Sequence, residues 1–266
     1  MNGKYILVVS FGTSYAETRE RTIEAIERQM AEEFPDYEVR RAFTSGMIIK
    51  KLRQRDGIEV DDLPTAFARL VEDGAEEVVV QPTHVMNGVE YDMVVDTVFQ
   101  CYENFKRVGL GTPLLNSIDD YDRVVGIIRD EYLVDEPDTA VVLMGHGTYH
   151  HANSAYPQLQ LKLQLAGMDD VYVTTVEGFP DFDDTVSMMR GKGYRNVVLY
   201  PLMLVAGDHA INDMAGDEED SLASVLKSEG YGVRSVIKGM GESPEFRRMF
   251  IDHARLAMAR SPEEDA

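Results

Sequence analysis

The chain has 266 residues, of which 44% are hydrophobic, so it can bury one large core or two of ordinary size. Lysines and arginines number 26 against 47 aspartates and glutamates, and the resulting net charge of −21 argues against non-specific nucleic-acid binding. A single cysteine, Cys101, excludes an internal disulfide. The sequence shows no secretory signal and no apolar stretch of membrane-spanning length, so we expect a cytoplasmic protein without a membrane partner.

The first half of the chain alternates between strand and helix patterns. Short apolar runs rich in β-branched residues predict strands at 5–10, 38–43, 77–81 and 113–115. Helical patterns, with Ser14 as the N-cap of the first, cover about 16–33, 63–73, 91–107 and 121–132. A basic, partly helical piece surrounds residues 50–55. An acidic, proline-bearing connection at 135–138 predicts a boundary between an N-terminal lobe, 1–136, and a C-terminal lobe, 137–266.

The second half repeats the order of the first. Strands are predicted near 139–143, 171–175, 196–199 and 232–236, and helices near 155–166, 183–192, 221–229 and 244–259. Residues 8–13 align with 142–148 after insertion of one residue, and 79–82 align with 198–201. The fold class predicted is therefore α/β, with two similar lobes, each a four-stranded parallel sheet flanked by helices, related by internal duplication and facing each other across a cleft.

Three glycine-containing turns follow strands of the second half. His146 stands between Gly145 and Gly147, Glu177 precedes Gly178, and His209 follows Gly207. Parallel strands end at one edge of their sheet, and open α/β sheets bind ligands there. The turns thus bring two imidazoles and a carboxylate toward one place, a set that suits a divalent transition metal and leaves coordination positions open.

Each candidate also has a plainer interpretation. His146 is alternatively a polar loop residue, and Glu177 carries meaning only together with the two histidines. Asp208 either orients an imidazole or caps the following helix. His150 and His151 are reserve ligands or a solvated loop, and His253 is expected to be structural. Residues 11–14 lack the spacing of a phosphate loop, and neither a dinucleotide fingerprint nor a nucleophile elbow is present.

Together with the duplicated halves, these turns resemble the single-subunit class II tetrapyrrole chelatases, and most of all the anaerobic-pathway cobalt chelatases that act on sirohydrochlorin. The resemblance spans nearly the whole chain and is carried by 10–14, 145–148, 176–178 and 204–210. It implies two Rossmann-like lobes with the macrocycle held in the cleft. It also implies that His146, Glu177 and His209 bind the cobalt ion, that His146 serves as the base, and that Glu90 is a cleft-facing acidic residue; His146, Glu177 and Glu90 are thereby implied as catalytic.

The activity implied by this resemblance is ATP-independent insertion of Co²⁺, a substrate ion, into sirohydrochlorin during cobalamin synthesis. A neutral imidazole both ligates a metal and accepts a proton near neutral pH, as this reaction requires. The many carboxylates of the ring need local donors, and Lys50, Lys51, Arg53 and Arg55 form one cluster. The residues predicted to contact substrate are Ser10, Phe11, Thr13, Ser14, Ser45, His84 and Thr148.

Three alternatives stay open at this point. Fe²⁺, Ni²⁺ or Zn²⁺ fits the same ligands, because histidine and carboxylate separate these ions weakly. A two-lobed carrier of metal or tetrapyrrole would bind without turnover, and a metal-dependent hydrolase would use the same three side chains. The sequence also leaves the oligomeric state open, with a homo-oligomer among the alternatives.

Overall fold

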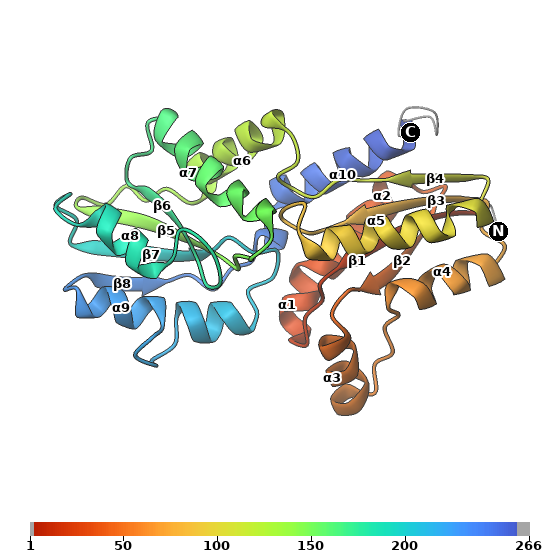
Figure 1. Ribbon diagram of the computed structural model, residues 1–266, viewed down its shortest axis with the longest axis horizontal. Helices are drawn as coiled ribbons and strands as arrows, with labels where there is room; N and C mark the ends of the chain where they lie inside the picture. Colours follow the sequence, from red (N-terminus) through yellow and green to blue (C-terminus); the bar gives the residue numbers. More distant parts are fainter. Residues whose placement is uncertain (1–2, 260–266) are drawn as a thin grey trace. The chain divides into compact units, whose positions relative to one another are not determined.

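The computed structural model describes residues 3–259, which form two compact units, each with its own sheet and core (Figure 1). The first unit consists of residues 3–116 and 241–259, and the second of Ser117–Met240. Positions 1–2 and 260–266 of the predicted lobes lie outside the described residues. Within the described part of the chain, no helix combines the length and the apolar character that crossing a bilayer requires.

The first unit contains a four-stranded parallel sheet in the order β2-β1-β3-β4. Its strands are β1 (Lys4–Ser10), β2 (Glu38–Phe43), β3 (Glu77–Pro82) and β4 (Arg107–Leu110). Tyr5 lies opposite Glu38 on one side and opposite Val78 on the other. Residues 5–10 of β1 are buried without interruption, as expected for a strand with both faces covered.

Helices cover both faces of this sheet. They are α1 (Ala16–Arg21), α2 (Ile23–Glu33), α3 (Gly46–Asp56), α4 (Leu63–Glu72), α5 (Val89–Cys101) and α10 (Pro244–Ala259). Leu7 of β1 shares a core with Phe67 of α4 and Val94 of α5. Strand side chains alternate between faces, so the buried Ile6 and Val8 face the other side, where α2 and α10 pack together on the strands.

The second unit repeats this topology with the order β6-β5-β7-β8. Its strands are β5 (Thr139–Gly145), β6 (Val171–Thr175), β7 (Asn196–Pro201) and β8 (Gly232–Ser235), and its helices are α6 (Ile118–Glu131), α7 (Ala155–Leu165), α8 (Phe182–Met189) and α9 (Leu222–Ser228). Val142 and Leu199 share a core with α8 and α9, while α7 packs on β6 and α6 packs on α7. The predicted fold class, two parallel four-stranded sheets flanked by helices, is confirmed.

The first predicted helix is interrupted. Thr22, at φ −117° and ψ −83°, leaves the helical conformation between α1 and α2, and its hydroxyl donates to the Thr18 carbonyl at 2.5 Å. A threonine that bonds to the preceding turn bends or breaks a helix. The N-cap position also differs from the prediction, because Tyr15 occupies it and Ser14 lies outside the helix.

The fourth strand lies earlier than predicted. Helix α5 ends at Cys101, a 3-10 turn follows at Tyr102–Asn104, and the strand is Arg107–Leu110 instead of 113–115. This strand pairs with β3, Arg107 lying opposite Glu77 and Gly109 opposite Val79. Its glycine lowers the local preference for a strand, so the position of β4 is determined by its pairing with β3. A local sequence pattern does not reveal such pairing.

The division into units also differs from the predicted boundary after residue 136. Helix α6 packs on α7, which places it with the second sheet. Helix α10, near the end of the sequence, packs on β3 and β4 and therefore belongs with the first. Gly109 permits this packing, because a Cβ there would lie only 2.6 Å from the Ala257 carbonyl oxygen.

Candidate functional site

The strand order of the second sheet indicates which two strand ends are expected to form the functional site. Strand β5 lies between β6 and β7, so the carboxyl ends of β5 and β7 form the topological switch point of the sheet, the place where open α/β sheets bind ligands. His146 directly follows β5, and His209 lies on the loop after β7. The two histidines are therefore brought together by strand order, although they lie far apart along the chain.

The two imidazoles are in contact. Their ring centroids lie 4.6 Å apart and the planes are nearly perpendicular, at 89°. Nδ1 of His146 lies 2.9 Å from the Gly147 carbonyl oxygen, and Nδ1 of His209 lies 2.7 Å from Oδ2 of Asp213. Both partners accept hydrogen bonds, so we assign the proton to each Nδ1. Each Nε2 then keeps its lone pair, the form in which imidazole ligates a metal.

Asp213 was not among the residues predicted from sequence. It belongs to a π-helical segment, η3 (Ala210–Met214), that begins directly after His209. The sequence contained a signal, because His209 and Asp213 are spaced i, i+4 and face the same side of a helical turn. That signal is visible only once a helical segment is assigned there, whereas the sequence alone suggests Asp208 for the orienting role.

The loops after β5 and β6 lie directly against each other. The backbone N–H of Glu177 donates to the His146 carbonyl oxygen at 2.8 Å. Gly147 has φ of +82°, and a Cβ at that position would lie 2.5 Å from the Gly178 nitrogen. Glycine is therefore required at 147 both for backbone conformation and for the close approach of the two loops.

Two side chains of the following segment hold these loops. The Asn153 side-chain oxygen accepts from the Thr148 N–H at 3.2 Å, and its amide nitrogen donates to the Phe179 carbonyl at 2.8 Å. The Gly147 N–H donates to the Tyr156 hydroxyl at 3.3 Å. Asn153 thus connects the loop that carries His146 to the loop that carries Glu177.

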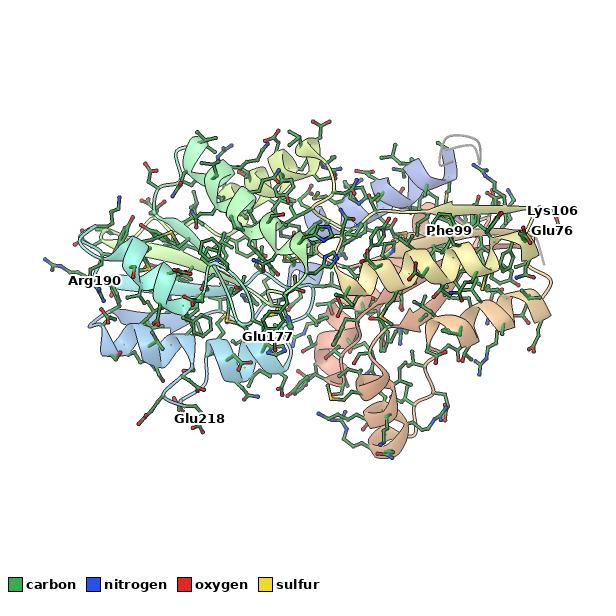
Figure 2. The ribbon with its side chains drawn as sticks, in the orientation of Figure 1. Glu76, Phe99, Lys106, Glu177, Arg190 and Glu218 are labelled. Atoms are coloured by element: carbon green, nitrogen blue, oxygen red, sulfur yellow. The ribbon has the colours of Figure 1, made fainter. Side chains whose placement is uncertain are left out.

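Glu177 has an exposed side chain on the loop after β6 (Figure 2). Its backbone is fixed by the bond to His146, while its carboxylate extends into solvent and keeps its hydration there. Across residues 3–259, no three side chains of the His, Cys, Asp and Glu types are grouped so that they could hold a metal ion. The structure therefore brings His146 and His209 together and leaves the Glu177 carboxylate outside that pair.

The first unit has a different pair at the equivalent strand ends. Ser10, the last residue of β1, forms a 2.8 Å hydrogen bond between its hydroxyl and that of Thr83, which follows β3. The Thr13 hydroxyl accepts from the Tyr15 N–H at 3.3 Å, and Ser45 caps α3. Among the predicted substrate contacts of this unit, Ser10, Thr13, Ser14 and Ser45 are buried, whereas Phe11 is 44% exposed.

His84 is the histidine of the loop after β3. Both of its ring nitrogens are buried, and neither has a hydrogen-bond partner in the part of the chain that the structure describes. Burial lowers the pKa of His84 to about 4, because charging the ring there costs hydration, so it is neutral at physiological pH. Glu90, half-buried, lies in the first turn of α5, where a carboxylate interacts favourably with the helix dipole.

The other candidates of the second half occupy structural positions. Thr148 is half-buried, and its hydroxyl accepts from the His150 N–H at 3.1 Å. The rings of His150 and His151 are in contact, with centroids 3.9 Å apart and planes tilted by 43°, and His151 is exposed. His253 lies buried in α10, where its Nδ1 lies 3.1 Å from the Thr112 carbonyl oxygen. These placements favour the plainer interpretation of His151 and His253.

Comparison with known proteins identifies relatives over the full length. Residues 4–259 match the family described as cobalt chelatase (CbiK). The sirohydrochlorin cobaltochelatase of Salmonella typhimurium is 43% identical over 263 residues, covering 99% of each chain. The sirohydrochlorin cobaltochelatase CbiKC of Nitratidesulfovibrio vulgaris is 30% identical, covering 97% of this chain and 92% of the relative. Among solved structures, SirB from Bacillus subtilis with Fe³⁺ has the same fold, with a TM-score of 0.64, 17% identity and 96% coverage of both chains.

Proposed function

Because the chain belongs to the cobalt chelatase (CbiK) family, we propose that it inserts Co²⁺ into sirohydrochlorin without ATP. The observation in the structure that supports this most is the contact between His146 and His209, each with Nδ1 committed to an acceptor and Nε2 free. Imidazole nitrogens bind cobalt well, yet they exchange for other nitrogen ligands, as transfer to a tetrapyrrole requires.

We propose that the substrate ion is held by Nε2 of His146, Nε2 of His209 and the carboxylate of Glu177. The exposed Glu177 side chain has the rotational freedom to join the pair, and its backbone is already fixed to the His146 loop. A set of two imidazoles and one carboxylate leaves positions for water that the ring nitrogens can replace.

Metal insertion also releases the pyrrole N–H protons of the ring. As the ion moves to the ring nitrogens, the lone pair of His146 Nε2 is freed and can accept one of these protons. The reaction balances as Co²⁺ and protonated ring in, metallated ring and protons out, so neither an oxidant nor a nucleotide is required. The catalytic role of Glu90 is part of the same proposal and is supported by the family resemblance. It is tested by measuring the rate of cobalt insertion by Glu90→Gln, which should be lower than that of the wild type.

Cobalt is proposed as the physiological ion. We expect Fe²⁺, Ni²⁺ and Zn²⁺ to bind the same three ligands and to be inserted into the ring at rates set by how fast each ion exchanges its ligands. The substrate contacts proposed are Ser10, Phe11, Thr13, Ser14, Ser45, His84 and Thr148. From the net charge of −21 we also infer that the protein binds neither nucleic acid nor an anionic membrane surface, and a cytoplasmic location is part of the same proposal.

The test is to mix purified protein with sirohydrochlorin and each of the four ions, and to follow the absorbance change of the ring. We expect acceleration over a blank of metal and ring alone, greatest with Co²⁺. No acceleration with any ion would overturn the enzyme proposal. Binding of the ring without acceleration would identify the protein as a carrier.

A further inference from the structure

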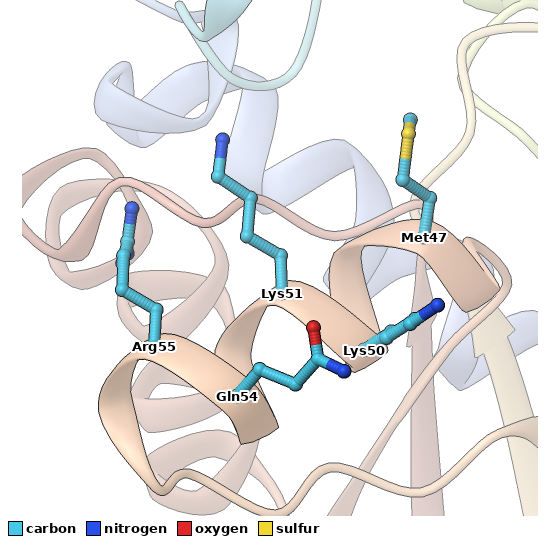
Figure 3. A pocket seen from close by; sticks show the side chains of 5 residues that line it. All are labelled: Met47, Lys50, Lys51, Gln54 and Arg55. Atoms are coloured by element: carbon cyan, nitrogen blue, oxygen red, sulfur yellow. The ribbon is translucent and has the colours of Figure 1, made fainter.

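Helix α3 presents a basic surface around a recess of about 440 Å³ (Figure 3). We call it the α3 patch and define it by the residues that line the recess: Met47, Lys50, Lys51, Gln54 and Arg55. Met47, Lys51 and Arg55 are spaced four residues apart and rise from the same side of the helix.

Local sequence fixes this helix firmly at both ends. The Ser45 hydroxyl accepts from the Ile48 N–H, and Gly57 ends the helix in the left-handed conformation at φ of +66°. Only Leu52 is buried, so the helix contributes little to the core while its polar side chains stay accessible. The sequence predicts the basic cluster but does not show which of its members share a surface.

The charges of the patch differ in how they are engaged. Arg55 is anchored, because it donates to both oxygens of Asp56 and to the Ser14 carbonyl. Lys50 and Lys51 form no ion pair with any of residues 3–259, and Lys51 Nζ lies 5.9 Å from the centre of the Tyr15 ring. Arg53 faces elsewhere, with its Nε 2.8 Å from Oε2 of Glu59, so the unneutralised charge comes from the two lysines.

Lys50 and Lys51 are consecutive residues of α3 and give this helix a local positive charge in a chain with a net charge of −21. A polycarboxylate ligand would be repelled by the protein as a whole and would need a local surface of opposite sign. Met47, 72% exposed, lines the same recess as the two lysines and adds a polarizable apolar contact there. Together these features fit a flat apolar ring with acidic side chains at its edge.

We propose that the α3 patch binds the peripheral carboxylates of the tetrapyrrole, with Lys50 and Lys51 as the donors and Arg55 as a fixed support. This inference rests on the proposed function, since it assigns a binding surface for the same substrate. It makes the patch a determinant of substrate choice, favouring rings that carry many carboxylate side chains over rings that carry few.

The experiment compares the wild type with the double variant Lys50→Gln/Lys51→Gln, which removes the charge and keeps a polar side chain that is one atom shorter. Binding of uroporphyrin, which is rich in carboxylates, and of protoporphyrin, which has fewer, is measured without metal from porphyrin fluorescence. Because exposed ion pairs are individually weak, we expect about fivefold to tenfold weaker binding of uroporphyrin, a smaller change for protoporphyrin, and a matching increase in KM for sirohydrochlorin with KM for Co²⁺ unchanged.

Two control variants separate the patch from general charge effects. Arg53→Gln removes a charge from the same helix outside the recess, and Lys192→Gln/Lys227→Gln removes the same charge as the test variant from exposed positions of the second unit. Both should bind uroporphyrin like the wild type. An unchanged affinity of the Lys50/Lys51 variant, or an equal loss in the Lys192/Lys227 control, would overturn the inference. Failure of the proposed function would show differently, as no cobalt insertion by the wild type.

Discussion

His146 and His209 are held by different kinds of acceptor, a backbone carbonyl for the first and a carboxylate for the second. A carbonyl fixes ring orientation and tautomer. A carboxylate does the same and also raises the basicity of the opposite nitrogen, so His209 should be the stronger ligand of the two. The difference is a property of single side chains, and it can be tested at Asp213.

Replacing Asp213 by Asn keeps an acceptor near His209 but removes the charge. Loss of such a partner lowers metal affinity or activity by about tenfold to a hundredfold, so KM for Co²⁺ should rise within that range while KM for sirohydrochlorin stays the same. Initial rates at varied Co²⁺ measure this. Asp217→Asn, an exposed neighbour on the following loop, is the control. Equal Co²⁺ dependence in the two variants would show that Asp213 does not act through His209.

His84 makes stability depend on pH through its burial. Its pKa is about 4 in the folded chain against an ordinary value of 6.5, so between these values the unfolded chain takes up a proton that the folded chain does not. Stability should therefore fall as pH drops below about 6.5, by up to about 1.4 kcal/mol per pH unit, and level off near pH 4.

A His84→Phe variant should lack this part of the pH dependence. Between about pH 7 and about pH 5 it should lose about 2 kcal/mol less stability than the wild type, as measured by urea denaturation. His151→Phe, at an exposed position, should keep the wild-type pH dependence. If His84→Phe and the wild type lose the same stability over this interval, the imidazole is not held neutral by burial.

At the level of elements, the loops after β5 and β6 act as one piece because Asn153 bonds to both. The histidine loop and the glutamate loop each have little regular structure of their own, so a side chain from the next segment supplies their shared support. A loop error of about 1 Å is enough to reduce catalysis strongly, which makes such a support functionally important.

Asn153→Ala should therefore lower the rate of metallation while the protein stays folded. We expect about a tenfold loss of kcat with a loss of about 1–3 kcal/mol in the free energy of unfolding, because two hydrogen bonds are lost, each worth about 0.5–1.5 kcal/mol. Ser154→Ala, which removes an adjacent hydroxyl that caps nothing, serves as the control. A kcat for Asn153→Ala equal to that of the control would contradict this role.

The sequence predicts the elements best where local pattern and tertiary structure agree. The continuous β-branched runs of β1, β3, β5 and β7 are examples, since burial on both faces requires such runs. The prediction fails for β4, whose glycine weakens the strand pattern and whose position depends on pairing with β3. It also misses η3, and with it Asp213, because a π-helical segment has no period that a search for α-helices detects.

For the molecule as a whole, one topology occurs twice with different chemistry at the same place. The strand ends that carry Ser10 and Thr83 in the first unit carry His146 and His209 in the second. The sequence alignment of the two halves predicts the repeated strand order, with residues 8–13 opposite 142–148 and residues 79–82 opposite 198–201. The packing of α10, which belongs to the second half of the sequence, on the first sheet is not predictable from the sequence. It depends on which of the two sheets has a face that the other helices leave partly open.

The return of α10 to the first sheet can be tested at Gly109. An alanine there would place Cβ 2.6 Å from the Ala257 carbonyl oxygen, so backbone must shift. Overpacking of this kind costs about 1–3 kcal/mol in the free energy of unfolding. Gly126→Ala, within α6 and with open space around the new methyl group, should instead add about 0.5–1 kcal/mol. Calorimetry showing equal stability for Gly109→Ala and the wild type would contradict the described packing.

The central claim is that His146 and His209 hold the cobalt ion that is transferred to the ring. The direct measurement is the rate of cobalt insertion into sirohydrochlorin by His146→Ala and His209→Ala, with ring binding followed by fluorescence in the same samples. Both variants should still bind the ring while their rates fall to about that of the protein-free blank. A variant that binds the ring and inserts cobalt at the wild-type rate would contradict the account.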